Sequence, residues 1–160
     1  MRIVIAALAV LALASPAAAQ NAGQVGRAVS GSSCPGCNLF QADFNGLERS
    51  GLDFSRARLR QADLSLTILN GARFSNADLR DIEAYGGVFA SASFAGADLT
   101  NASLVGTHLR GANFAGATLT GANLSGADLG GARGLTQTQL DRACGDATTA
   151  LPAGLHIPPC

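Results

Sequence analysis

The chain has 160 residues, about the size of one domain, with eleven basic residues, all of them Arg, against eleven acidic ones. A net charge of zero at pH 7 gives no long-range field of either sign, which argues against nucleic-acid binding and against the acidic surface expected of a DNA mimic. The absence of Trp and the abundance of Ala and Gly exclude an ordinary core of interlocking large side chains.

Residues 1–19 have the pattern of a secretory signal peptide. A basic start at Arg2 precedes the apolar residues 3–14, and an Ala-x-Ala cleavage pattern ends at Ala19. The alternative is an uncleaved membrane anchor, but an apolar run of about twelve residues is shorter than the roughly 20 that span a bilayer. We therefore expect cleavage before Gln20, export to the periplasm or the medium, and no membrane span afterwards.

Residues 20–33 are small and polar, with few apolar side chains to anchor them. Such a composition predicts a flexible lead-in. Val25 and Val29 are placed to pack on whatever follows as a partial cap.

From residue 37 the chain is written in five-residue units such as ADFNG at 42–46 and ANLSG at 122–126. The central position recurs from Leu39 to Gly134 in steps of five, and 17 of its 20 occurrences are Leu or Phe. This period fits neither a helix nor an alternating strand, so the backbone must turn a corner in each unit. Four units then make a square coil of about twenty residues, with the central residue and the small residue two before it pointing inward.

Residues twenty apart should stack on one wall of such a coil. Two columns of identical residues have this spacing: Phe54, Phe74, Phe94 and Phe114, and Leu59, Leu79, Leu99 and Leu119. Offset stacking of rings adds about 0.5–1.5 kcal/mol per pair beyond the burial of their area. The two columns predict a stacked core that is independent of the five-residue count.

The A(D/N)(L/F)xx reiteration resembles the pentapeptide repeat family over about residues 37–134. The resemblance implies an all-β solenoid, a right-handed quadrilateral β-helix of about five 20-residue coils, which we assign to residues 34–134. It implies little about activity, because the repeats of this family are scaffold and its members act in different ways.

The position two after each centre predicts the turn type. From Gly106 to Gly131 it is always Gly, which favours type II corners with a positive φ. At Arg56, Gln61, Leu66 and Asp81 a larger residue takes this position, and other turn types are expected there. 

Two places depart from the repeat. Arg49 occupies a centre, where a lone charge inside an apolar shaft is costly, and Leu47 and Leu52 are bulky where Ala is usual. We expect a local distortion or bulge in the first coil. In residues 82–87 the large and small inward residues are exchanged, which can conserve volume, and Tyr85 is presented outward.

Residues 135–160 should close the C-terminal end of the solenoid, because open ends must be covered. Thr136 and Gln139 have the spacing of a capping box and predict a helix over about 136–144. The apolar, Pro-rich tail after it is expected to wrap back over the helix or the last coil. An exposed helix here could also pair with its copy in a homodimer.

Four cysteines in an exported chain indicate two disulfides. Cys34 and Cys37 lie at the start of the solenoid, Cys144 and Cys160 follow its end, and the two ends are separated by roughly 24 Å at strand spacing. A disulfide needs Cα atoms within about 7 Å. The predicted pairs are therefore Cys34 with Cys37 and Cys144 with Cys160.

The spacing of Cys34 and Cys37 also occurs in thiol oxidoreductases and in half of a zinc site. An oxidoreductase places the first Cys at a helix start in a βαβ setting, which is missing here. The two His residues, His108 and His156, lie far along the chain from this pair. We favour a structural disulfide and keep thiol chemistry as an alternative.

The outward positions carry one mildly basic patch, formed by Arg56, Arg58, Arg60 and Arg80. Arg suits carboxylate and phosphate groups. With Tyr85, these residues are the candidate contact surface, and the alternative is a solvated face with Asp78, Asp81 and Asp98 as counter-charges.

The leading hypothesis is a non-enzymatic exported scaffold that binds a protein partner, without cofactor, metal or nucleic acid. The alternatives are a thiol-redox protein using Cys34 and Cys37 and, from the family resemblance, a DNA mimic that binds a topoisomerase. The two His lack an evident catalytic partner. Some Asp follow the repeat and are expected to bond local backbone: Asp43, Asp63, Asp78, Asp98 and Asp128.

Overall fold

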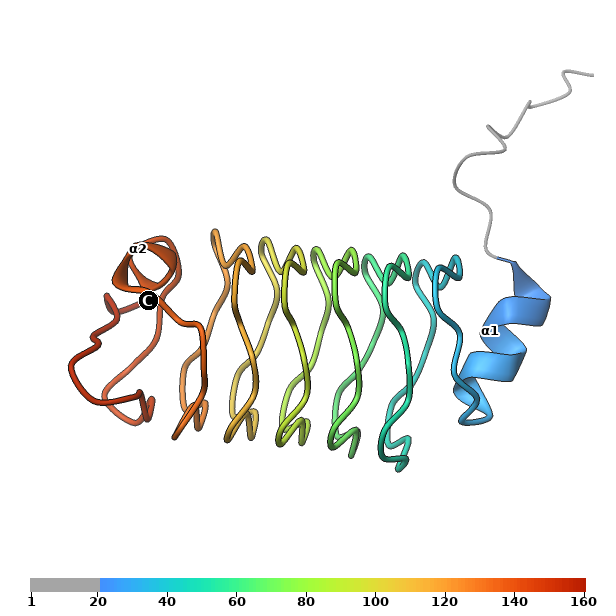
Figure 1. Cartoon of the computed structure of the whole chain (residues 1–160), viewed down its shortest axis with the longest axis horizontal. Helices are drawn as coiled ribbons and strands as arrows, with labels where there is room; N and C mark the ends of the chain where they lie inside the picture. The colour runs from blue at the N-terminus through green and yellow to red at the C-terminus, as the bar shows by residue number, and fades with distance from the viewer. Residues whose placement is uncertain (1–20) are drawn as a thin grey trace, which may run out of the picture.

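The computed structural model describes residues 21–160, so the predicted signal segment 1–19 and its cleavage site lie outside the described residues. Figure 1 shows an elongated coil with helix α1 (Ala22–Val29) at one end and helix α2 (Gln137–Leu140) at the other. Neither helix in this part of the chain is long and apolar enough to cross a membrane.

Between the helices the chain winds as a four-walled coil with twenty residues per turn. Parallel bridges join residues twenty apart, from Asn38 with Arg58 to Asn113 with Arg133. A turn begins two residues after nearly every bridged residue, and the next bridged residue comes five residues after the last. Within residues 21–160 the walls therefore consist of single bridged residues, because the chain turns again before an extended strand can form.

We number the walls by their central residues, and each corner takes the number of the wall before it. The first wall has Leu39, Leu59, Leu79, Leu99 and Leu119. The second has Phe44, Leu64, Ala84, Leu104 and Leu124. The third has Arg49, Leu69, Phe89, Leu109 and Leu129. The fourth has Cys34, Phe54, Phe74, Phe94 and Phe114.

Two kinds of backbone hydrogen bond hold each unit, as the first wall illustrates. Leu59 N–H donates to the Asp78 carbonyl of the next coil at 2.8 Å, and Asp78 N–H donates back to Ala57 at 3.0 Å. Ala62 N–H donates to the Leu59 carbonyl at 2.9 Å and closes the corner. The backbone polar groups of each wall are thus paired along the solenoid axis, which leaves the shaft free for apolar side chains.

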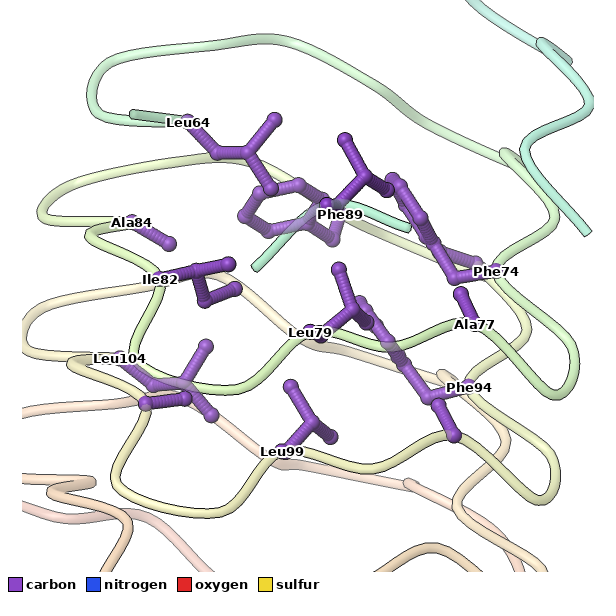
Figure 2. Close-up of a cluster of buried hydrophobic side chains, with 14 of the residues drawn as sticks. Leu64, Phe74, Ala77, Leu79, Ile82, Ala84, Phe89, Phe94, Leu99 and Leu104 are labelled. Carbon is purple, nitrogen blue, oxygen red and sulfur yellow. The ribbon is translucent and has the colours of Figure 1, made fainter. Parts of the chain in front are cut away.

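The two predicted columns are confirmed. Ring centroids on the fourth wall are 5.6 Å apart for Phe54 and Phe74, and 5.2 Å apart for both Phe74 with Phe94 and Phe94 with Phe114, all in stacked orientation. The column Leu59, Leu79, Leu99 and Leu119 is fully buried. Figure 2 shows Phe74 and Phe94 of the first column beside Leu79 and Leu99 of the second.

The predicted positive φ values are confirmed from Gly106 to Gly131, where φ lies between 65° and 72°. The expectation of other turns at larger residues is wrong: φ is 59° at Arg56 and Gln61 and 57° at Leu66 and Asp81. Each of these residues also donates its N–H to the next coil, as Gln61 does to Arg80 at 3.0 Å. The backbone hydrogen bonds between successive coils, which we call the ladder, thus impose the same corner on residues that rarely adopt a positive φ.

The prediction of a flexible lead-in over 20–33 is wrong for α1. The Asn21 side chain caps this helix by accepting from Gln24 N–H at 3.1 Å. Ala28 is buried, and Val25 and Val29 pack against the first coil, which confirms their predicted capping role. The helix is short and contains Gly, so packing on the solenoid rather than intrinsic propensity must stabilise it.

The predicted capping box of Thr136 and Gln139 is present, but α2 ends at Leu140 instead of about 144. The reason is that the chain returns to the second wall. Cys144 bridges with Asn123, donating to Ala122 at 2.9 Å and accepting from Leu124 at 2.7 Å. The tail then packs Leu151, Leu155 and Ile157 against the core, so it wraps back as predicted.

Replacing Phe74 by Ala should lower the free energy of unfolding by about 3–5 kcal/mol, because the ring packs between Phe54 and Phe94 on neighbouring coils. Chemical denaturation of the purified protein measures this loss. Leu66→Ala, at an exposed position, is the matched control and should change stability by about 0.5 kcal/mol or less. Equal effects of the two substitutions would contradict the stacked core.

Candidate functional site

The second corner carries an exposed apolar pair. Leu66 is 56% exposed and Tyr85 is 59% exposed, and they are the two large hydrophobic side chains of residues 21–160 that face solvent to this extent. They lie on successive coils, since Leu66 N–H donates to the Tyr85 carbonyl at 2.9 Å. Leu66 Cδ2 also lies 3.1 Å from the position of a Cβ built on Gly86, so the Leu66 side chain covers that glycine.

Three further apolar residues at outward positions adjoin this pair. Ile68 and Val88 are bridged to each other on the third wall and are half-buried, and Val105 follows Tyr85 along the second corner. We call the set the Tyr85 strip: Leu66, Ile68, Tyr85, Val88 and Val105. Exposed apolar side chains that lie close together mark interaction sites on soluble proteins more often than isolated ones do.

A row of acidic residues lies beside the Tyr85 strip on the second wall. Asp43 bridges with Asp63, and Asp63 bridges with Glu83, so their side chains share one outward column. Among the ion pairs of residues 21–160, none involves these three carboxylates. The strip is therefore bordered on this side by uncompensated negative charge.

The structure does not bring the four predicted Arg together with Tyr85, because one wall separates the first corner from the second. Arg80 forms two 2.7 Å hydrogen bonds with Asp78, and Arg60 pairs with Asp81 at 3.0 Å. Arg56 and Arg58 are exposed and have no ion pair within the described part of the chain. Two of the four predicted Arg are thus already engaged by counter-charges.

The Arg80–Asp78 pair fixes the protonation of both groups. Hydrogen bonds from Arg80 and its positive charge lower the pKa of Asp78 against the opposing effect of burial. Asp78 in turn raises the pKa of Arg80. Both side chains stay ionised at neutral pH, so neither is placed to transfer a proton.

Comparison with known families identifies the repeat. Eight copies of the pentapeptide repeat match residues 29–61, 50–82 and 92–131, which is more than half of the chain. The chain belongs to the pentapeptide repeat family. Its members fold as right-handed quadrilateral β-helices, and this is the fold of the four-walled coil described above.

Solved pentapeptide repeat proteins resemble the chain. Rfr23 from the cyanobacterium Cyanothece 51142 is 26% identical, with 81% of this chain and 97% of Rfr23 covered and a TM-score of 0.58. A protein from the Arabidopsis thaliana thylakoid lumen is 37% identical over 56% of this chain and 52% of its own, with a TM-score of 0.33. HetL from Nostoc sp. PCC 7120, involved in heterocyst differentiation regulation, is 27% identical over 76% of this chain and 58% of its own, with a TM-score of 0.40. No curated protein matches the sequence.

Residues 83–91, which the pentapeptide repeat model leaves unmatched, still follow the coil. Ile82 and Ala84 are both fully buried, and Figure 2 shows them pointing into the shaft between Leu64 and Leu104. The exchange of large and small side chains therefore keeps the shaft filled, as predicted.

Arg49, the charged residue at a centre, leaves the shaft. Its side chain is exposed, and its Nη1 donates to the Glu48 carbonyl at 2.8 Å. Residues 50 and 51 form a bend in place of the hydrogen-bonded turn found at the other corners of the repeat. The predicted local distortion is confirmed, but no bulge forms, because Glu48 still bridges with Ile68 twenty residues later and Arg49 N–H donates to Ile68 at 2.8 Å.

The repeated Asp side chains bond the backbone two residues later, as predicted. Asp43 accepts from Asn45 N–H at 2.9 Å, and Asp63 accepts from Ser65 N–H at 2.8 Å. Asp78, Asp98 and Asp128 make the same contact at 3.4, 3.0 and 2.9 Å. These carboxylates stabilise corners and are not arranged as a catalytic pair.

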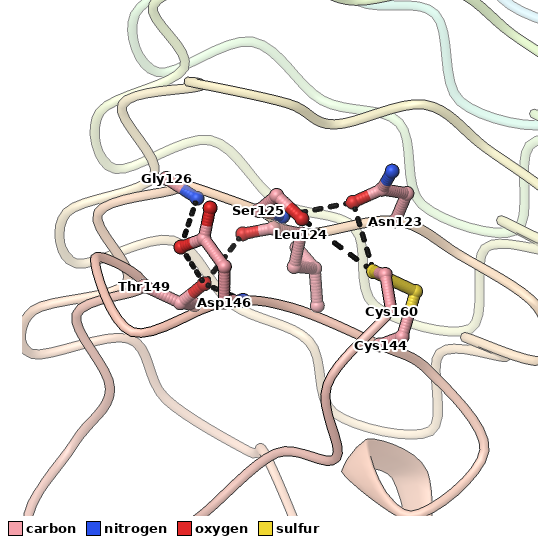
Figure 3. The surroundings of a disulfide bond; sticks show 8 residues. All are labelled: Asn123, Leu124, Ser125, Gly126, Cys144, Asp146, Thr149 and Cys160. Atoms are coloured by element: carbon pink, nitrogen blue, oxygen red, sulfur yellow. Dashed lines mark hydrogen bonds between the residues drawn. A yellow bond between two sulfur atoms is a disulfide. The ribbon is translucent and has the colours of Figure 1, made fainter.

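The two predicted disulfides are confirmed. Cys34 is joined to Cys37 across the fourth corner with a Cα–Cα distance of 5.5 Å, and Cys144 is joined to Cys160 with one of 4.8 Å. Figure 3 shows the second disulfide beside Asn123 on the second wall, so it ties the end of the tail to the last coil.

The alternative roles of Cys34 and Cys37 find no support in their surroundings. Both residues are buried, at 4% and 6% exposure, so a thiol substrate has little access to their sulfur atoms. Within residues 21–160, no group of three His, Cys, Asp or Glu is arranged to hold a metal ion.

Sequence reasoning predicted Tyr85 as a contact residue and missed the rest of the Tyr85 strip. Leu66, Ile68 and Val88 occupy repeat positions that face outward, where polar residues are usual. A comparison of residues twenty apart at outward positions would have found them, because Ile68 and Val88 share one such column.

Removing the C-terminal disulfide with Cys144→Ala and Cys160→Ala should lower the free energy of unfolding by about 3 kcal/mol on the chain-entropy model. Denaturant titration without reducing agent measures the change. The Cys34→Ala, Cys37→Ala variant is the comparison and should lose about 2 kcal/mol from loop closure, because its loop is shorter. An unchanged midpoint in the first variant would show that the tail needs no covalent tie.

Asp146 should make stability depend on acid pH. Hydrogen bonds from Thr148, first through its side chain and then through its backbone N–H, and from Gly126 lower the pKa of Asp146. Because the folded pKa is below the unfolded value of about 3.9, the stabilisation is complete above that pH and is lost as the pH falls through the folded pKa. Asp146→Ala should therefore melt below the wild type at pH 7, and the difference should narrow below about pH 4. A gap that is constant from pH 7 to pH 2 would contradict this.

Proposed function

We propose that this protein is an exported, non-enzymatic scaffold whose Tyr85 strip binds another protein. One observation carries the proposal: the two most exposed large hydrophobic side chains of the described residues, Leu66 and Tyr85, lie on neighbouring coils at one corner. Neighbouring exposed apolar side chains are favoured positions for a partner to cover, and Tyr is frequent among the residues that dominate interfaces.

The solenoid supports this role by holding the strip rigid. About five coils of twenty residues, with a cap at each end, present the strip on a backbone whose groups are bonded from coil to coil. A preorganised surface loses little conformational entropy on binding, which favours affinity.

The surroundings of the strip indicate what kind of partner fits. The acidic row Asp43, Asp63 and Glu83 lies along one side, and Glu48 lies next to Ile68 on the third wall. A partner with an apolar centre and basic residues at its rim would complement both features. We expect such a partner rather than an acidic one.

Two features support export to the periplasm or the medium. The pattern of residues 1–19 is that of a signal peptide. Residues 21–160 contain two disulfides, and disulfides persist in oxidising compartments. The partner should therefore be an exported or surface-exposed protein.

The other hypotheses have less support. Thiol chemistry needs access to Cys34 and Cys37, which are buried. A topoisomerase-binding DNA mimic needs an extended acidic surface, but the acidic row is short and borders apolar residues. A homodimer through the C-terminal cap would rest on α2, which has four residues.

The test is partner capture from the exported fraction with the mature protein as bait. Leu66→Asn together with Tyr85→Asn should weaken recovery of the partner by roughly 30-fold, the effect of losing about 2 kcal/mol at the centre of an interface. Asn tolerates the positive φ of residue 66 and should keep the corner intact.

The matched control is Arg56→Asn together with Arg58→Asn, which removes two exposed side chains on and beside the first wall and should leave recovery unchanged. Recovery that falls with the control variant and not with the Leu66 and Tyr85 variant would move the contact to the Arg patch and contradict the proposal.

A further inference from the structure

We call the unit of one wall in one coil a rung. In the last coil, the rungs of the second and third walls are bridged to the following chain, by Asn123 with Cys144 and Asp128 with Ala150, whereas the first wall ends at Thr118 and the fourth at Arg133. Where the first wall would continue, about twenty residues after Thr118, the chain forms α2 instead. A pocket of about 180 Å³ lies at this place, which we call the first-wall notch. The residues that line it include Thr118, Leu119, Thr138, Gln139 and Arg142.

A complete rung on this wall satisfies three backbone groups of the rung before it. Leu99 N–H donates to the Thr118 carbonyl, and Asn101 N–H donates to the Thr120 carbonyl, each at 2.9 Å. The Ala97 carbonyl accepts from Thr118 N–H at 2.9 Å. The rung of Leu119 therefore presents two donors and one acceptor to the notch.

Residues of the C-terminal cap, 135–160, supply partners for two of these three groups. The Arg142 carbonyl accepts from Gly121 N–H at 2.7 Å, and the Gln139 side chain donates to the Ala117 carbonyl at 2.8 Å. Leu119 N–H has no partner among the described residues, although Leu119 is only 1% exposed. Unpaired buried N–H groups are rare in native proteins, and this one needs an acceptor.

The side chains that line the notch include one positive charge, Arg142, and no carboxylate. Arg142 is exposed and forms no ion pair in residues 21–160. Two nearby acceptors already have a donor each, because Asp141 accepts from the Gln137 side chain at 2.6 Å and Gln139 Oε1 accepts from Thr136 N–H at 2.8 Å. The notch is thus a small site that can donate hydrogen bonds to a ligand and has one positive charge.

We propose that the first-wall notch binds an oxyanion, the carboxylate or phosphate group of a small ligand. One ligand oxygen takes the place of the missing carbonyl and accepts from Leu119 N–H. A second oxygen accepts from the Arg142 guanidinium, which suits both groups, and the hydroxyls of Thr118 and Thr138 complete the site. The notch lies on the first wall at the C-terminal end, away from the Tyr85 strip, so this activity is independent of the proposed scaffold function.

The experiment is an NMR titration of the mature protein with inorganic phosphate and, separately, with acetate. We expect a saturable shift of the Leu119 amide signal with at least one anion, and the tighter of the two assigns the group as phosphate or carboxylate. Arg142→Ala should weaken binding by about ten- to hundredfold, as loss of a charged hydrogen bond does. The variant keeps the backbone carbonyl that bonds Gly121, so the cap should remain folded.

Arg133→Ala is the matched control, because Arg133 is exposed at the same end of the solenoid and does not line the notch. It should bind as the wild type does. The proposal is overturned if neither anion gives a saturable shift at Leu119, or if Arg133→Ala weakens binding as much as Arg142→Ala.

Discussion

The backbone ladder between residues twenty apart is the constraint on which the rest of this molecule depends. Because N–H and C=O groups pair along the axis, every unit must turn at the same place and point the same two side chains into the shaft. The shaft then admits Leu or Phe at the centre and a small residue beside it. The ladder even holds Arg56 and Leu66 at positive φ, which costs about 1–2 kcal/mol per residue outside Gly.

A ladder of this kind has two open ends, and side chains close them. Gln24 of α1 accepts from Asn38 N–H at 2.8 Å at the first coil, and Gln139 of α2 donates to Ala117 at the last. Each amide replaces a backbone group that a further coil would supply. At Leu119 the replacement is incomplete, so the Leu119 N–H remains available to donate to a ligand.

Much of this fold could be predicted from the sequence, because each position of the repeat requires a particular kind of side chain. The Phe54 column, the capping box at Thr136 and both disulfide pairs follow from spacing and from the separation of the two ends. Helix α1 and the end of α2 do not, because tertiary contacts decide them: packing on the first coil for one and the return of Cys144 to the second wall for the other.

Of the Tyr85 strip and the first-wall notch, only a part could be predicted from the sequence. Tyr85 is visible as an outward aromatic residue, whereas its neighbour Leu66 is recognised only when corners on successive coils are compared. The first-wall notch could not be predicted, since it depends on a rung that the cap leaves out. Outward residues are free to vary once the ladder is satisfied, and this freedom is what allows one scaffold to carry different contact surfaces.

Amide hydrogen exchange along the first wall tests the ladder most directly. Leu59, Leu79 and Leu99 donate to the next coil at 2.8–2.9 Å, and their N–H groups should exchange slowly, at the rate of global opening. Leu119 has the same residue type in the same column but lacks that acceptor, so its N–H should exchange much faster. Equal protection of Leu119, or rapid exchange at Leu59, Leu79 and Leu99, would contradict a continuous twenty-residue register that ends at the notch.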